Sequence, residues 1–253
     1  MSRNEKHVVG LLCRTSERGP EAAQGTRELA QLFGARIIGS PGEPRAFGWQ
    51  EDLRDGRGCL LEAGGQVDDA FEAGRAPILL AGECSVAVAT LPVVVRRRPD
   101  AHVLWLDAHA DFNTPDTTLS GYLGGMCLAG ACGLWETGFE PPLHPARVIM
   151  HGVRDVDGAE RVALDRSGVH RIDAAHQLEG LELYVHIDLD VLDPTAFPAA
   201  FAVRGGLAPD ALRDFLSEVT STCTVTGAEI TAAAPGYAEV AADATEPLLA
   251  AIG

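Results

Sequence analysis

The sequence has no apolar run long enough to cross a bilayer, and it is poor in basic residues. Lys and Arg total 20 against 36 Asp and Glu, which gives a formal net charge of −16 at pH 7. Nucleic acid and acidic membrane surfaces would repel such a chain, so neither is an expected partner. The first residues also lack the apolar segment of a signal peptide, and we therefore expect a cytoplasmic protein.

The six cysteines contain no Cys-x-x-Cys pair, which argues against a thioredoxin motif and a zinc knuckle. In a cytoplasmic protein we expect them to be reduced, and most of them to serve as small buried apolar residues. Cys84 is the exception, for reasons that depend on its neighbours in the sequence.

Hydrophobic residues make up 46% of the 253 residues, which excludes a disordered chain and is enough for one large domain over residues 1–253. Short runs rich in Val, Ile and Leu alternate with helical stretches along nearly the whole chain. This alternation predicts an α/β fold with a mainly parallel sheet, covered by helices on both faces. A TIM barrel would suit the length, but the irregular strand spacing favours an open sheet.

Each predicted element has the composition of a strand, a helix or a loop. Strands are expected at 8–13, 35–39, 76–81, 101–107, 148–153, 169–172, 183–187 and 224–230. Helices are expected at 19–33, 59–73, 85–97, 121–133, 158–166, 209–220 and 241–252. Residues 40–56, rich in Pro, Gly and charge, are expected to form a loop.

Two aspartate-rich segments each close a predicted strand: Asp107-Ala-His109-Ala-Asp111 and Asp188-Leu-Asp190. Side chains alternate along a strand, so the named residues of each segment can share one face. At the carboxyl edge of a parallel sheet, four carboxylates and an imidazole would then meet. They would repel one another without a cation, so the pattern predicts a pair of divalent metals.

A single Asp-x-Asp after a strand is more often a turn or a helix cap. Two such segments at two strand ends, one of which contains a histidine, favour the metal site instead. The argument for metal therefore depends on both segments occurring in one chain.

Both segments, together with Phe112-Asn113-Thr-Pro, Ser120-Gly121 and the continuation to Asp193-Pro194, resemble the signatures of the arginase/agmatinase (ureohydrolase) family. The resemblance extends from about residue 76 to residue 235 in the family's motif order. It implies a three-layer α/β/α sandwich that carries out manganese-dependent hydrolysis of a guanidino group on a small molecule. It also implies a possible homo-oligomer.

The resemblance implies two Mn²⁺ ions, with Zn²⁺ or Fe²⁺ as alternatives. Asp107 and Asp188 would bridge the ions, His109 and Asp190 would complete one of them, and Asp111 would bind the other. Metal coordination lowers the pKa of water toward neutrality and so supplies a nucleophile. Asp111 is the expected catalytic residue that passes a proton to the leaving amine.

The family pattern Gly-Gly-Asp-His-Ser corresponds here to Ala81-Gly82-Glu83-Cys84-Ser85. Cys84 is therefore expected to bind metal in place of the histidine, since a thiolate is also a metal ligand. A buried cysteine without such a role is the alternative. Cys84 and the segment Gly-Tyr-Leu-Gly-Gly-Met at 121–126 resemble the family members that hydrolyse Nω-hydroxy-L-arginine to ornithine and hydroxyurea.

Two further positions depart from the family. Gly124 occupies the position of a histidine that shuttles protons, and Ala232 that of a glutamate that binds the guanidinium. Glu229, three residues before Ala232, should face the opposite way on its strand. These departures leave two alternatives open: hydrolysis of another amidino or formimino acid, and a catalytically silent family member that binds metal.

Asn113 and Ser120 match family positions that bind an α-carboxylate, and Asp157 matches one that holds an α-ammonium. They favour an amino-acid substrate over agmatine, although each could instead cap a loop. His186 precedes Asp188 by two residues and is expected either to hydrogen-bond a ligand carboxylate or to be a satisfied core histidine.

Overall fold

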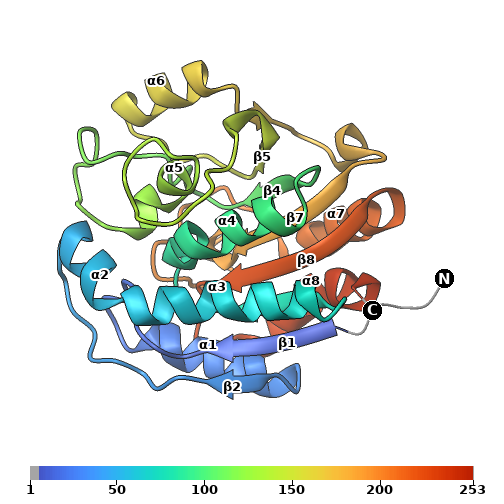
Figure 1. The fold of residues 1–253 in the computed structure, drawn as a ribbon. Coiled ribbons are helices and arrows are strands. Elements are labelled where there is room, and N and C mark those ends of the chain that lie inside the picture. Colours follow the sequence, from blue (N-terminus) through green and yellow to red (C-terminus); the bar gives the residue numbers. More distant parts are fainter. Residues whose placement is uncertain (1–5, 253) are drawn as a thin grey trace.

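The computed structural model describes residues 6–252, in which eight parallel strands form one sheet in the order β2-β1-β3-β8-β7-β4-β5-β6 (Figure 1). The strands are β1 (Lys6–Leu11), β2 (Arg36–Ile38), β3 (Ala76–Leu80), β4 (His102–Leu106), β5 (Val148–His151), β6 (His170–Arg171), β7 (Glu182–Asp188) and β8 (Thr224–Thr231). All eight strands expected from the sequence are present, and their pairing confirms the parallel sheet.

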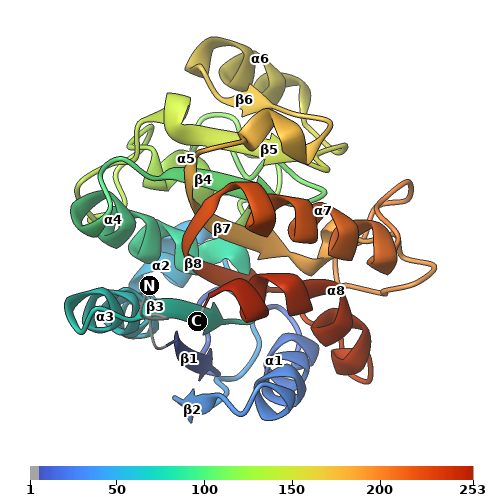
Figure 2. The ribbon, with the colours of Figure 1, turned by 90° about the vertical axis from the view of Figure 1, so that its right-hand side faces the viewer.

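Helices cover both faces of this sheet. They are α1 (Glu21–Leu32), α2 (Trp49–Asp55), α3 (Arg57–Glu72), α4 (Ala87–Arg97), α5 (Cys127–Ala131), α6 (Gly158–Ser167), α7 (Pro209–Thr222) and α8 (Ala238–Ala251). Figure 2 shows α3 and α4 on one side of the strands and α1, α7 and α8 on the other. The expected three-layer α/β/α sandwich is therefore confirmed.

The alternation of side chains along the central strands explains why both faces are buried. On β7, Leu183, Val185 and Ile187 pack in the core beneath α7 and α8. Tyr184 points to the other core, beneath α3 and α4. A strand that is buried on both faces has a continuous apolar run in its sequence, and this pattern predicted the strand.

One local prediction was wrong, and another was right only in part. Residues 40–56 include the helix α2, whose Trp49 ring packs against Trp135 at 5.1 Å between ring centroids. Its buried Asp52 pairs with Arg14, so contacts distant in sequence hold this segment in a helix. The helix predicted at 121–133 is shorter than expected, because only residues 124–131 are helical, as a 3₁₀ turn followed by α5.

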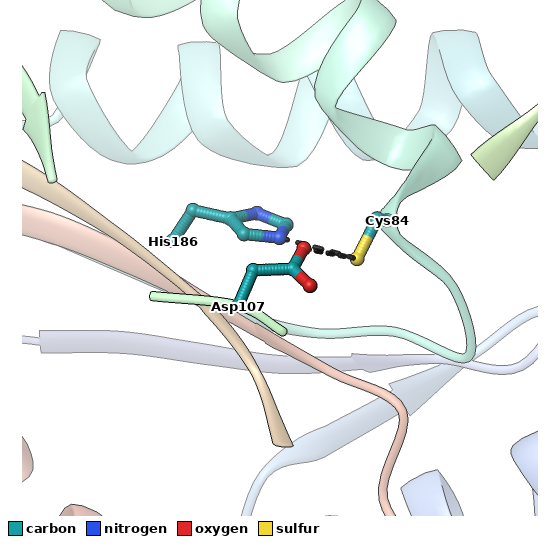
Figure 3. A group of neighbouring side chains, drawn as sticks. All are labelled: Cys84, Asp107 and His186. Atoms are coloured by element: carbon teal, nitrogen blue, oxygen red, sulfur yellow. Dashed lines mark hydrogen bonds between the residues drawn. The ribbon is translucent and has the colours of Figure 1, made fainter. Parts of the chain in front are cut away.

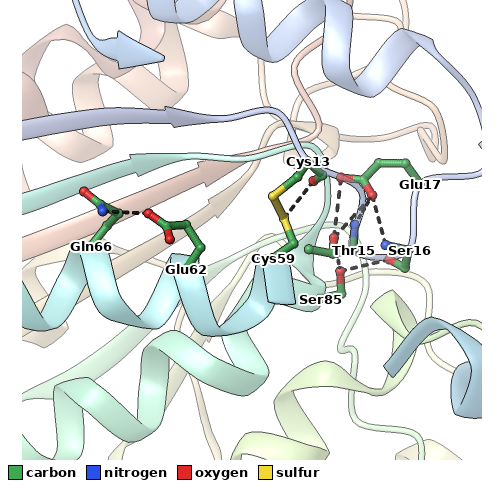
Figure 4. The surroundings of a disulfide bond; sticks show 8 residues. All are labelled: Cys13, Thr15, Ser16, Glu17, Cys59, Glu62, Gln66 and Ser85. Carbon is green, nitrogen blue, oxygen red and sulfur yellow. Dashed lines mark hydrogen bonds between the residues drawn. A yellow bond between two sulfur atoms is a disulfide. The ribbon is translucent and has the colours of Figure 1, made fainter. Parts of the chain in front are cut away.

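The expectation that all six cysteines are reduced was also wrong. Cys13, after β1, and Cys59, in the first turn of α3, form a disulfide bond (Figure 4). The fold brings their Cα atoms to 5.8 Å although 46 residues separate them, so their spacing in the sequence gave no signal. Cys84, Cys127 and Cys132 are free and buried, and Cys223 is free and partly exposed.

No helix within residues 6–252 is both long enough and apolar enough to span a membrane.

Candidate metal centre

The candidate residues follow the carboxyl ends of strands in the middle of the sheet. Asp107 follows β4 and Asp188 ends β7, and the register pairs the residues just before them, Leu106 and Ile187. Cys84 begins a 3₁₀ turn shortly after β3. Parallel strands end at one edge, so these side chains meet there, as the sequence predicted.

A cavity of about 220 Å³ opens at this edge. All nine residues that the sequence predicted to bind metal or substrate line it: Cys84, Asp107, His109, Asp111, Asn113, Ser120, Asp157, Asp188 and Asp190. The structure therefore brings the predicted metal-binding residues and the predicted substrate-binding residues into one pocket.

The first group of potential ligand atoms comes from Asp107, His109 and Asp190, which lie within 4.8 Å of one another. The Nδ1 atom of His109 is 2.8 Å from Oδ2 of Asp190 and 3.5 Å from Oδ1 of Asp107. Two carboxylates and one imidazole at this spacing can hold a divalent ion.

The second group centres on the Cys84 sulfur. Sγ of Cys84 lies 2.8 Å from Oδ2 of Asp188 and 4.0 Å from Oδ2 of Asp107. Figure 3 shows Cys84 and His186 pointing toward one another beside Asp107. Asp107 belongs to both groups, so its carboxylate can bridge two ions.

Asp111 lies in the same cavity and is buried, with a φ of 50°. This left-handed conformation is uncommon outside glycine and often marks functional positions. Its backbone carbonyl accepts hydrogen bonds from the N–H groups of Leu128 and Ala129 at the start of α5. The same turn brings the thiol of Cys127 to 3.5 Å from Oδ2 of Asp111.

Burial and neighbouring charges shift the pKa values of these groups. Burial, followed by the charge of Asp190, raises the pKa of Asp188 to about 7. Burial and Asp107 raise the pKa of Asp190 to about 6 and that of Asp111 well above the ordinary value. Burial lowers the pKa of His109, but its bonds to Asp107 and Asp190 outweigh this effect and raise it to about 12.

The Cys84 thiol follows the same rule, because burial and then the charge of Asp188 raise its pKa well above the ordinary value. A group of acids that resists ionisation in this way needs more positive charge than His109 alone supplies. Divalent cations would supply it, and the donor set of carboxylates, one imidazole and one thiol suits such ions. The residues present therefore fit the two metals expected from the sequence.

Hydrogen bonds from N–H groups fix the orientation of the carboxylates. Oδ1 of Asp188 accepts from the backbone N–H of Asp190 at 2.7 Å, and Oδ1 of Asp190 accepts from that of Ala108 at 2.9 Å. Asp107 accepts from the backbone N–H of His109 at 2.6 Å and from the indole N–H of Trp105 at 3.1 Å. Carboxylates held in this way are preorganised for metal binding.

His186 is fully buried and both of its ring nitrogens have partners, so the expectation of a satisfied core histidine is confirmed, whereas no bond to a ligand carboxylate forms within residues 6–252. Its Nε2 lies 3.2 Å from Sγ of Cys84, and its Nδ1 lies 2.7 Å from Oε1 of Glu229. The ring stacks on Trp105 with centroids 3.6 Å apart. Glu229 also accepts from the hydroxyl of Thr90 in α4 at 2.6 Å, so it faces the α4 side of the sheet.

The predicted substrate residues lie on loops beside the metal groups. Nδ2 of Asn113 donates to Oδ2 of Asp157 at 3.4 Å, while Oδ1 of Asn113 is buried and has no partner in the part of the chain that the structure describes. The hydroxyl of Ser120 accepts from the backbone N–H of Tyr122 at 3.2 Å, so Ser120 stabilises a turn as well as lining the cavity. A buried, unpaired amide oxygen suits a pocket that receives a polar ligand.

The sequence did not single out Arg18, Glu83, Tyr122 or Phe201, which also line the cavity. Tyr122 accounts for the glycine at position 124, because a Cβ there would lie 2.5 Å from the tyrosine ring. The ring therefore occupies the space that a side chain at Gly124 would need. The motif at 121–126 was the available signal for Tyr122, whereas Arg18 and Phe201 arrive from distant loops.

Comparisons with known proteins agree with the geometry. The model of the Arginase family matches residues 52–252. The N(omega)-hydroxy-L-arginine amidinohydrolase of Streptomyces lavendulae is 38% identical over 202 residues, which cover 76% of this chain and 74% of that protein. The arginase of Bacillus caldovelox is 32% identical over 165 residues, which cover 56% of this chain and 55% of that protein.

The crystal structure of arginase from Bacillus subtilis superposes with a TM-score of 0.80 over 99% of both chains at 21% identity, a likeness of fold. The family match covers most of the sequence, and the Streptomyces relative extends over three quarters of it. The chain belongs to the arginase family, whose members are hydrolases that act on guanidino- and amidino-type C–N bonds.

Proposed function

We propose that this enzyme hydrolyses Nω-hydroxy-L-arginine to ornithine and hydroxyurea with two divalent metal ions. The observation that carries the proposal is the position of Cys84, whose sulfur lies 2.8 Å from Asp188 at the centre of the carboxylate cluster. The Streptomyces lavendulae relative, whose name states this substrate, supports it.

One ion would be held by Cys84, Asp107, Asp111 and Asp188, and the other by Asp107, His109, Asp188 and Asp190. Two observations support this division. His109 approaches Asp190 at 2.8 Å, and Asp107 belongs to both ligand groups. When bound, the ions supply water whose pKa is low enough to yield a nucleophile near neutral pH.

Mn²⁺ is the metal we propose, because carboxylate-rich ligation with one imidazole suits it. A thiolate also suits Zn²⁺ and Fe²⁺, so metal analysis is part of the test. Anomalous scattering from metal-loaded crystals would count the ions and locate the Cys84 sulfur relative to the nearer one.

The amino-acid end of the substrate would be held by Asn113, Ser120 and Asp157. The first two would donate hydrogen bonds to the α-carboxylate, and Asp157 would accept from the α-ammonium. The unpaired amide oxygen of Asn113 is an acceptor, so it supports a bound donor such as the α-ammonium at this end of the pocket.

In the reaction, water adds to the guanidine carbon and the bond from that carbon to the ornithine nitrogen breaks. Asp111, buried and held in its turn, would carry the proton from the attacking water to the leaving amine. Burial raises the pKa of Asp111, so its carboxyl takes up a proton more readily than that of an ordinary aspartate.

The pocket favours N-hydroxyarginine over arginine because position 124 carries no imidazole, and the Tyr122 ring takes up its space. An N-hydroxyguanidine is less basic than a guanidine, so its products depend less on assisted proton transfer. Ornithine release from both substrates tests this argument. We expect a much higher kcat/KM with hydroxyarginine, and equal or reversed values would remove the proposed specificity.

Ala232 supports a second candidate, hydrolysis of another amidino or formimino acid, because a methyl group occupies the family position of the guanidinium-binding glutamate. A panel of guanidino, amidino and formimino acids separates the two candidates. Two bound ions without turnover of any panel member would indicate a silent family member.

A further inference from the structure

One wall of the cavity takes no part in the proposed contacts to metal or to the amino-acid end. It is formed by Glu83 and Tyr122, with Arg18 and Phe201 at its edge. Phe201 packs on Tyr122 with ring centroids 5.2 Å apart, and the Arg18 guanidinium lies 4.5 Å above the tyrosine ring. These contacts hold the tyrosine ring in one place.

Glu83 is a buried carboxylate, 6% exposed, next in sequence to Cys84. A second buried carboxylate, Glu17, lies beside it, since a Cβ on Gly82 would be 2.5 Å from Oε1 of Glu17. Within residues 6–252, neither glutamate forms an ion pair with Lys, Arg or His. Glu17 accepts hydrogen bonds from the backbone N–H groups of Thr15 and Ser16, so its charge is already stabilised. Among the described residues Glu83 has no cation partner, which indicates that a positive or N–H-rich group binds to its carboxylate.

Tyr122 provides an independent indication. Its side chain is buried, with 9% of the residue exposed, and its hydroxyl has no hydrogen-bond partner among residues 6–252. The hydroxyl lies in the same cavity wall as Glu83. A buried hydroxyl left without a partner is destabilising unless a ligand satisfies it.

The chain also leaves room around Glu83. A second cavity, lined by Glu83, Ala232, Pro198 and Ala200, adjoins it on the side of β8. The methyl group of Ala232 places no polar atom there. Glu83 therefore lies between the metal pocket and this cavity, where its carboxylate can take up an incoming ligand.

We propose that Glu83 and Tyr122 form the subsite for the guanidine-type head of the substrate. A carboxylate can accept two parallel N–H bonds from a planar guanidinium, and the tyrosine hydroxyl can pair with an N-hydroxyl group. This rests on the proposed function, because it assumes a substrate with such a head. In this subsite, Glu83 forms the ion pair with the guanidinium that Ala232 cannot form.

Calorimetric binding to the metal-loaded enzyme tests the subsite without turnover of the proposed substrate. L-Arginine and L-citrulline have the same shape at the head, but citrulline carries a neutral urea. We expect wild type to prefer arginine at least tenfold, and Glu83→Gln to lose at least tenfold affinity for arginine and less than twofold for citrulline. In steady-state ornithine release, Tyr122→Phe should raise the KM for hydroxyarginine several-fold more than it weakens arginine binding.

Glu17→Gln is the matched control, since Glu17 is buried beside Glu83 but does not line the metal cavity. It should retain the arginine preference. Metal content and melting temperature of each variant establish that it is folded and loaded. An unchanged arginine-to-citrulline ratio in Glu83→Gln, or an equal loss in both glutamate variants, would overturn the subsite. If wild type fails to hydrolyse hydroxyarginine yet Glu83→Gln alone loses the arginine preference, the proposed substrate fails and the subsite survives.

Discussion

Without divalent metal, the folded protein should be less stable at pH 8 than at pH 5. The pKa of Asp188 is about 7 in the metal-free fold, against 3.8 for an ordinary aspartate. Between these values the folded chain keeps a proton that the unfolded chain has released. The free energy of unfolding therefore falls as pH rises through this window.

The size of the effect follows from the difference between the two pKa values. Each unit corresponds to about 1.4 kcal/mol, so Asp188 alone should lower stability by about 4 kcal/mol between pH 4 and pH 8. For a chain of this length, this corresponds to roughly 10 °C in melting temperature. The raised pKa of His109, about 12, acts in the same direction, because the stability its charge provides is lost as pH rises above 6.5.

Differential scanning calorimetry at several pH values, with EDTA or with Mn²⁺, measures this. Bound metal should reverse the trend, because it competes with protons for the same oxygens. The net charge of −16 also disfavours the folded state at high pH, so a variant must separate the two effects. Asp188→Asn should flatten the metal-free curve, and Asp116→Asn, at an exposed position, should not. A metal-free melting temperature that rises from pH 5 to pH 8 would refute the reasoning.

Three further predictions concern metal, substrate and packing. Cys84→Ser should weaken binding of one ion by at least roughly tenfold in a metal titration, while Cys132→Ser, at another buried free cysteine, should retain both ions. Asn113→Ala should raise the KM for hydroxyarginine about tenfold and change kcat much less, which steady-state kinetics would reveal. Gly25→Ala should lower the free energy of unfolding in urea by about 1–3 kcal/mol, because its Cβ would lie 1.7 Å from the carbonyl oxygen of Ala233; an unchanged value would contradict the packing.

The sheet and the nine candidate residues were predictable from the sequence because both depend on local pattern. Apolar runs identify buried strands, and residues that follow parallel strands converge at one edge without knowledge of the strand order. Asp107 and Asp188 are 81 positions apart in the sequence, yet their strands are neighbours. The family resemblance then supplied the expected role of each residue.

Long-range contacts set the limit of such prediction. The helix α2 depends on the pairing of Trp49 with Trp135 and on the burial of Asp52. The bond between Cys13 and Cys59 depends on the position of α3 beside the end of β1. The contact of His186 with Cys84 joins β7 to the 3₁₀ turn after β3. Periodicity could place the histidine on one face of its strand but could not identify its partner.

The indole of Trp105 is an intrinsic fluorescent probe. It lies flat against the His186 imidazole, with centroids 3.6 Å apart, and donates its N–H to Asp107. The other two tryptophans, Trp49 and Trp135, pack against each other and not against His186. Emission from Trp105 should therefore respond when Asp107 changes its partners, so intrinsic fluorescence offers a label-free way to follow ion uptake in real time.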